Sequence, residues 1–122
     1  MKKLLPLAVA LIVPLLLFSF TSGIRTNASE DEDEGITKLI ESATTPEDHM
    51  KIADYYEKQA AKAERKARFH ASMGDSYKNR SKPLAGLATH CSNLANKYKE
   101  AAEEYKAMAT EHRKMAQEMQ MQ

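Results

Sequence analysis

Residues 53–74 read ADYYEKQAAKAERKARFHASMG, and residues 88–116 read ATHCSNLANKYKEAAEEYKAMATEHRKMA. Both stretches place a small residue at every seventh position, which we label a in a heptad abcdefg. These small residues are Ala53, Ala60, Ala67 and Gly74, and then Ala88, Ala95, Ala102, Ala109 and Ala116. A seven-residue repeat is typical of helices packed along one seam, and small side chains let the two backbones approach closely. The two stretches therefore predict a closely packed helix pair.

Start and stop signals give the limits of the two helices. Thr45-Pro46-Glu47-Asp48 supplies an N-cap hydroxyl, a proline suited to the first helical position, and acids at the positive end of the dipole. Ser81-Lys82-Pro83 interrupts the pattern before the second helix. We predict helices at about 46–80 and 83–120. Because so short a link makes them antiparallel, residues 45–122 form a long helical hairpin, and the fold class is all-α.

The composition limits the class of protein. A chain of 122 residues makes one small domain, and 18 basic against 17 acidic residues give a net charge of +1. One cysteine excludes an internal disulfide, and 4 Gly with 4 Pro are few for a β-rich fold. The sequence has no Gly-rich phosphate loop, and its seam carries no paired carboxylates or Ser/His/Asp set. We expect neither an enzyme nor a nucleic-acid-binding protein.

The N-terminus has the pattern of an export signal. Met1-Lys2-Lys3 is positively charged, residues 4–20 are an uncharged apolar run, and two stretches of small residues follow at 21–23 and 26–28. This order predicts a secretory signal peptide at 1–28, and the two-lysine start favours the bacterial periplasm or the extracellular space. The alternative is an uncleaved anchor, since about 17 apolar residues can just span a bilayer. Membrane contact is expected only through this segment.

An acidic segment and a short helix precede the hairpin. Residues 30–34 are all acidic, and a block of like charge is typical of a solvated spacer. We therefore predict a flexible linker at 29–35. Ile36, Leu39, Ile40 and Ala43 then follow helical spacing, which predicts a short amphipathic helix at 36–44.

The d positions of the heptads bring polar side chains to the seam. For a hairpin that turns near residues 80–82, facing residues have numbers that sum to about 161. This register pairs His49 with His112 and His70 with Cys91. Met115 and Met73 each lie three residues beyond one of these histidines, on the same helix face. We thus predict two ligand layers: His49, His112 and Met115 in one, and His70, Cys91 and Met73 in the other.

Imidazole with thioether or thiolate is a borderline-to-soft donor set. Such a set suits copper best, zinc or nickel less well, and calcium or magnesium poorly. The alternative is that the histidines and methionines only pack and set the register of the hairpin. The chain would then be a structural or chaperone-like protein of the cell envelope that binds a client protein.

A second apolar row lies beside the seam of the second helix. Its members occupy position g: Leu87, Leu94, Ala101, Met108 and Met115. Because one partner helix cannot cover positions a, d and g together, this row predicts a further contact. We expect a homo-oligomer, with two hairpins forming a four-helix bundle, or else contact with a client protein.

Overall fold

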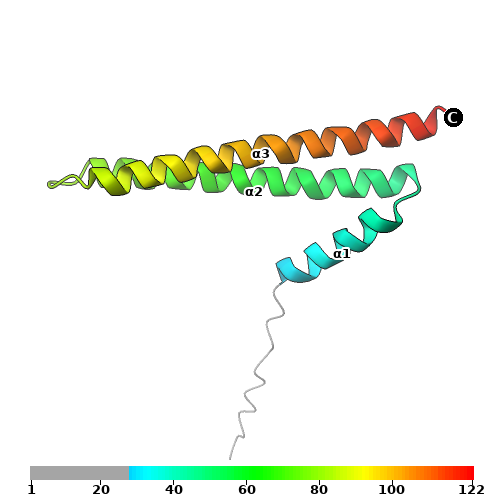
Figure 1. Cartoon of the computed structure of the whole chain (residues 1–122), viewed down its shortest axis with the longest axis horizontal. Coiled ribbons are helices and arrows are strands. Elements are labelled where there is room, and N and C mark those ends of the chain that lie inside the picture. Colours follow the sequence, from blue (N-terminus) through cyan, green and yellow to red (C-terminus); the bar gives the residue numbers. More distant parts are fainter. Residues whose placement is uncertain (1–27) are drawn as a thin grey trace, which may run out of the picture.

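The computed structural model describes residues 28–122 as three helices (Figure 1). They are α1 at Ala28–Ser42, α2 at Pro46–Lys78 and α3 at Ala85–Gln120. Helices α2 and α3 lie antiparallel, while α1 lies obliquely beside the open end of the pair. The predicted all-α hairpin is therefore confirmed. The predicted signal peptide lies outside the described residues except for its last position.

Helix α2 begins where the sequence predicts. The Thr45 hydroxyl accepts a hydrogen bond from the Asp48 backbone N–H at 3.2 Å, and the Asp48 carboxylate accepts from the Thr45 N–H at 3.1 Å. This reciprocal capping box satisfies amides that the first helical turn leaves free. The Thr45 side chain is the main cause of the lowered pKa of the Asp48 carboxyl, and the backbone N–H of Thr44 lowers this pKa further. The capping box therefore stabilises the start of α2 at Pro46.

The turn of the hairpin occupies residues 79–84. The Asn79 N–H donates to the Asp75 carbonyl at 2.9 Å and ends α2. The Leu84 N–H then donates to the Tyr77 carbonyl at 3.1 Å, which ties the start of α3 to the last turn of α2. Helix α3 begins at Ala85 rather than at Pro83, and its N-cap, Leu84, forms no side-chain hydrogen bond.

The small residues at position a form the core of the hairpin. Every one of them is buried in the seam: Ala53, Ala60, Ala67, Gly74, Ala88, Ala95, Ala102, Ala109 and Ala116. Ala60 and Ala102, which face each other in the predicted register, are each 2% exposed. The alanine heptads thus hold the two backbones close together along the full length of the pair.

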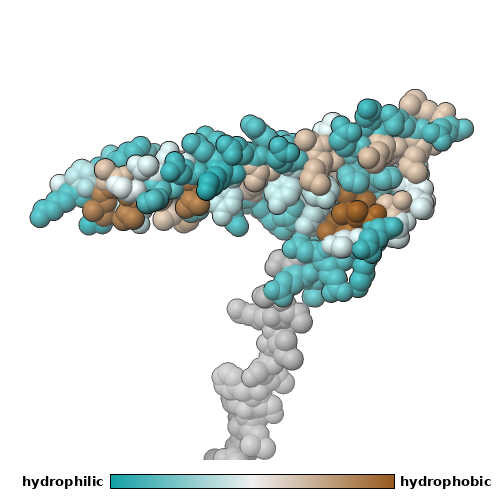
Figure 2. Space-filling model, viewed as in Figure 1, coloured by the Kyte–Doolittle hydropathy of each residue, from teal (hydrophilic) through white to brown (hydrophobic). Residues whose placement is uncertain are grey.

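The two sides of the seam differ in chemistry. On the side of position e, Arg113 of α3 pairs with Glu57 of α2 at 2.6 Å, and Lys106 pairs with Glu64. The side of position g is apolar at the open end, where Ile52 of α2 is fully buried beneath Ile36 and Leu39 of α1. Figure 2 shows hydrophobic side chains gathered where α1 meets the hairpin.

The predicted linker at 29–35 is wrong, because these residues are helical and belong to α1. Asp33 accepts a hydrogen bond from the Tyr55 hydroxyl at 2.7 Å, and Glu32 lies 3.4 Å from the Lys62 ammonium. Burial and the hydrogen bond to Asp33 raise the pKa of the Tyr55 hydroxyl. Partners on α2 offset the acidic repulsion, and acids are favourable in the first turn of a helix. The short helix predicted at 36–44 is the second half of α1.

The apolar row at position g of α3 is only partly covered. Leu87, Leu94, Met108 and Met115 remain 40–46% exposed. Contact with a second copy, predicted from this row, stays a prediction. None of the helices within 28–122 is long and apolar enough to cross a membrane.

We predict that Ala60→Leu destabilises the hairpin. The larger side chain must push α3 away at a site that is 2% exposed, which costs about 1–3 kcal/mol of unfolding free energy. Urea unfolding followed by circular dichroism measures this loss. The exposed neighbour Ala61→Leu is the matched control, and equal stability of the two variants would contradict the close-packed seam.

Candidate functional site at the seam

Two histidines from opposite helices meet near the open end of the hairpin. His49 lies in the first turn of α2 and His112 lies near the end of α3, and their Nδ1 atoms are 3.0 Å apart. Their ring centroids are 5.3 Å apart with an interplanar angle of 30°. At this distance one neutral ring donates its Nδ1–H to the other. The predicted meeting of His49 and His112 is confirmed.

The histidine pair is the first step of a ladder of stacked rings. His112 stacks on Tyr56 with centroids 5.9 Å apart, and Tyr56 stacks on Tyr105 at 6.2 Å. Their interplanar angles are 25° and 23°. The rings alternate between α2 and α3, and they all occupy position d. Such stacking restricts the orientation of the imidazoles and holds their Nδ1 atoms close together.

The surroundings of His112 disfavour its positive charge. Burial lowers the pKa of His112 below the ordinary value of 6.5, and the neighbouring His49 lowers it further. Both causes favour the neutral imidazole, which is the form that binds metal ions.

The third predicted ligand of this layer lies differently. Met115 follows His112 by one helical turn but belongs to the g row, where it is 41% exposed. The structure therefore places two imidazoles in the seam and the thioether at its edge. Within 28–122 there is no group of three or more His, Cys, Asp or Glu side chains arranged to hold a metal ion.

The second predicted layer is arranged around a different contact. His70 stacks on Tyr98 with centroids 5.4 Å apart and an interplanar angle of 7°. The buried Cys91 lies opposite Gly74, where an added Cβ would be 3.4 Å from the Cys91 Cβ. No hydrogen bond joins His70 to Cys91 in the part of the chain that the structure describes, and Met73 is half-buried nearby in sequence.

One atom of this second layer is unusual. The Nδ1 atom of His70 is buried and has no hydrogen-bond partner among the described residues. Buried polar atoms are nearly always hydrogen-bonded, so this nitrogen is an exception among the described residues. Tyr98 was not among the residues predicted for this layer. The signal that could have identified it was the recurrence of rings at position d one heptad further along α3.

Comparison with known proteins returned no match: no family model, no curated protein and no solved structure is significantly similar to the chain. The functional assignment therefore depends on the geometry of the seam.

We predict that the protein is less stable at pH 5 than at pH 8. Because the pKa of His112 is lowered by folding, the unfolded chain binds more protons once the pH falls below 6.5, and unfolding becomes more favourable there. The urea midpoint measured across this range should fall as the pH falls.

The matched variants are His112→Gln, which should flatten this pH dependence, and His90→Gln at an exposed histidine, which should not. If the urea midpoint of the wild-type protein does not change between pH 8 and pH 5, this would contradict a lowered pKa of His112 at its contact with His49.

Proposed function

We propose that the chain is an exported, non-catalytic helical protein that binds a transition-metal ion, with copper favoured, through His49 and His112. The observation that supports this proposal most directly is the 3.0 Å separation of their Nδ1 atoms. Export and a periplasmic or extracellular location rest on the pattern of residues 1–28 alone.

The spacing of the imidazoles supports this proposal. Metal–nitrogen bonds to histidine are about 2.0–2.1 Å long, so two neighbouring ligands at roughly 90–110° have nitrogens about 2.9–3.4 Å apart. The two rings can therefore share one ion once the donating ring carries its proton on Nε2 instead of Nδ1 and both rings tilt toward the ion. Imidazole donors suit copper, zinc and nickel, and they suit calcium or magnesium poorly.

Two protein ligands leave coordination positions open. Met115 lies one helical turn from His112, and its exposed side chain is free to turn toward the ion. A second hairpin could supply another histidine pair, so that metal binding and dimerisation would support each other. Zinc or nickel would bind less well than copper if the Met115 thioether joins the set.

His70, Cys91 and Met73 remain a second proposed metal layer. The buried, unpartnered Nδ1 atom of His70 supports it, and a thiolate from Cys91 would release a proton on metal uptake. This layer requires a side-chain rearrangement, because His70 stacks on Tyr98 and Cys91 lies opposite Gly74.

The alternative function is a structural or chaperone-like module of the cell envelope. The exposed g row of Leu87, Leu94, Met108 and Met115 favours it, because a row of partly exposed apolar side chains can bind a client protein or a second copy. In this alternative the histidines only pack and set the register.

We predict that copper binding raises the unfolding temperature of the purified protein, since an ion that binds only the folded chain stabilises it. Isothermal titration with Cu²⁺, Zn²⁺ and Ni²⁺ measures affinity and stoichiometry. His49→Ala and His112→Ala should each weaken copper binding about tenfold or more, because each removes one of two imidazole ligands.

His90→Ala, at an exposed histidine, is the control and should bind as wild type does. Cys91→Ala tests the second layer separately, because it leaves His49 and His112 intact. A thermal melt that none of the three metals moves would favour the alternative function.

A further inference from the structure

The ring ladder at position d lacks a ring at one place. From the open end, the stacked rings are His49, His112, Tyr56 and Tyr105, and nearer the turn Tyr98 stacks on His70. Between Tyr105 and Tyr98, position d of α2 is Ala63, which has no ring to place there. The two tyrosines therefore flank a gap. Elsewhere in the ladder, a ring from α2 occupies the corresponding place between two side chains of α3.

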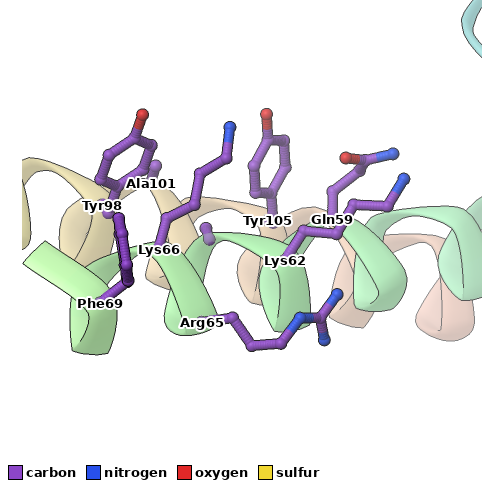
Figure 3. Close-up of a pocket in the computed structure, with 9 residues that line it drawn as sticks. Gln59, Lys62, Arg65, Lys66, Phe69, Tyr98, Ala101 and Tyr105 are labelled. Atoms are coloured by element: carbon purple, nitrogen blue, oxygen red, sulfur yellow. The ribbon is translucent and has the colours of Figure 1, made fainter. Parts of the chain in front are cut away.

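An open groove of about 440 Å³ lies at this gap. Ala63 of α2 and Ala101 of α3 line it with methyl groups, and Tyr98 and Tyr105 flank it. Figure 3 shows the two tyrosines projecting from α3 on the same side, with Lys66 in the space between them. Ligand sites commonly measure about 300–1,000 Å³, so the groove has room for a small ring system.

The charged groups that line this groove are all positive. They are Lys62, Arg65 and Lys66, and no carboxylate lines the groove. Neither Arg65 nor Lys66 forms an ion pair with another residue of 28–122, while Lys62 lies 3.4 Å from Glu32. The opposite side of the seam is different, because Arg113 and Lys106 there are neutralised by Glu57 and Glu64.

We propose that this groove binds a small planar aromatic anion. Its ring enters the space between Tyr98 and Tyr105 when the flexible Lys66 side chain turns outward, and it stacks there as His112 does on Tyr56. Its carboxylate, sulfonate or phosphate group lies against Lys66 and Arg65, whose charges lack acidic partners among the described residues. Lys66 already lies 5.3 Å from the Tyr98 ring centroid, so the cation and the stacking surface form one site.

This site is separate from the proposed metal site. Ala63 is fourteen residues beyond His49 along α2, which is about 21 Å of helix. Either site can therefore fail without affecting the other.

The test uses two fluorescent probes that share one ring system. The anion 8-anilinonaphthalene-1-sulfonate carries a sulfonate, and N-phenyl-1-naphthylamine is the uncharged analogue. Fluorescence titration of the purified chain should show the anion binding about tenfold more tightly, because one ion pair in a partly sheltered groove supplies that difference. Equal affinities for the two probes would overturn the charge selectivity.

Two sets of variants test whether the anionic probe binds in the groove at Ala63. Ala63→Phe supplies the missing ring and should reduce binding of the anion about tenfold, whereas Ala61→Phe on the exposed face should not. The double substitution Lys66→Gln with Arg65→Gln should weaken the anion but not the uncharged probe, and the distant Lys114→Gln should weaken neither.

Circular dichroism checks that each variant stays helical. If Ala63→Phe unfolds, the double substitution still decides the matter, because it changes only partly exposed side chains. Anion binding that survives both changes would place the probe on the exposed g row and overturn the proposal.

Discussion

The close approach of α2 and α3 along their buried alanines is the constraint on which the rest of the structure depends. An alanine at every position a removes the bulk that would hold two helices apart. It also contributes little apolar area, so the seam gains its remaining stability from the larger side chains at position d. These side chains must share a narrow space, and flat rings meet that requirement by stacking.

That stacking also brings two histidine side chains from opposite helices into contact. His49 and His112 are held at 3.0 Å because each lies in the same row as the tyrosines, with ring planes inclined by 30°. Two imidazoles whose Nδ1 atoms lie this close would supply two of the ligands of the transition-metal site that we propose. The same ladder explains the groove at Ala63, where a methyl group replaces a ring.

The two sides of the seam carry different kinds of side chain. Ion pairs such as Glu57 with Arg113 line the side of position e and fix the register of the hairpin. Helix α1 covers the side of position g at the open end, around Ile52. Toward the turn this side continues as an open surface with exposed leucines and with Arg65 and Lys66, which form no ion pair within residues 28–122. The ligand that we propose for the groove and the predicted client protein or second copy would meet the hairpin on that side.

The sequence by itself determined the helix pair, its antiparallel direction and the meeting of His49 with His112, because heptad spacing and the position of the turn fix which residues share a level. Only the tertiary structure decided that residues 29–35 are helical, since their partners Tyr55 and Lys62 lie on another helix. It also paired His70 with Tyr98. Each ring at position d can stack on two residues of the facing helix, and because Cys91 has no ring, Tyr98 one heptad further along α3 is the ring on which His70 stacks.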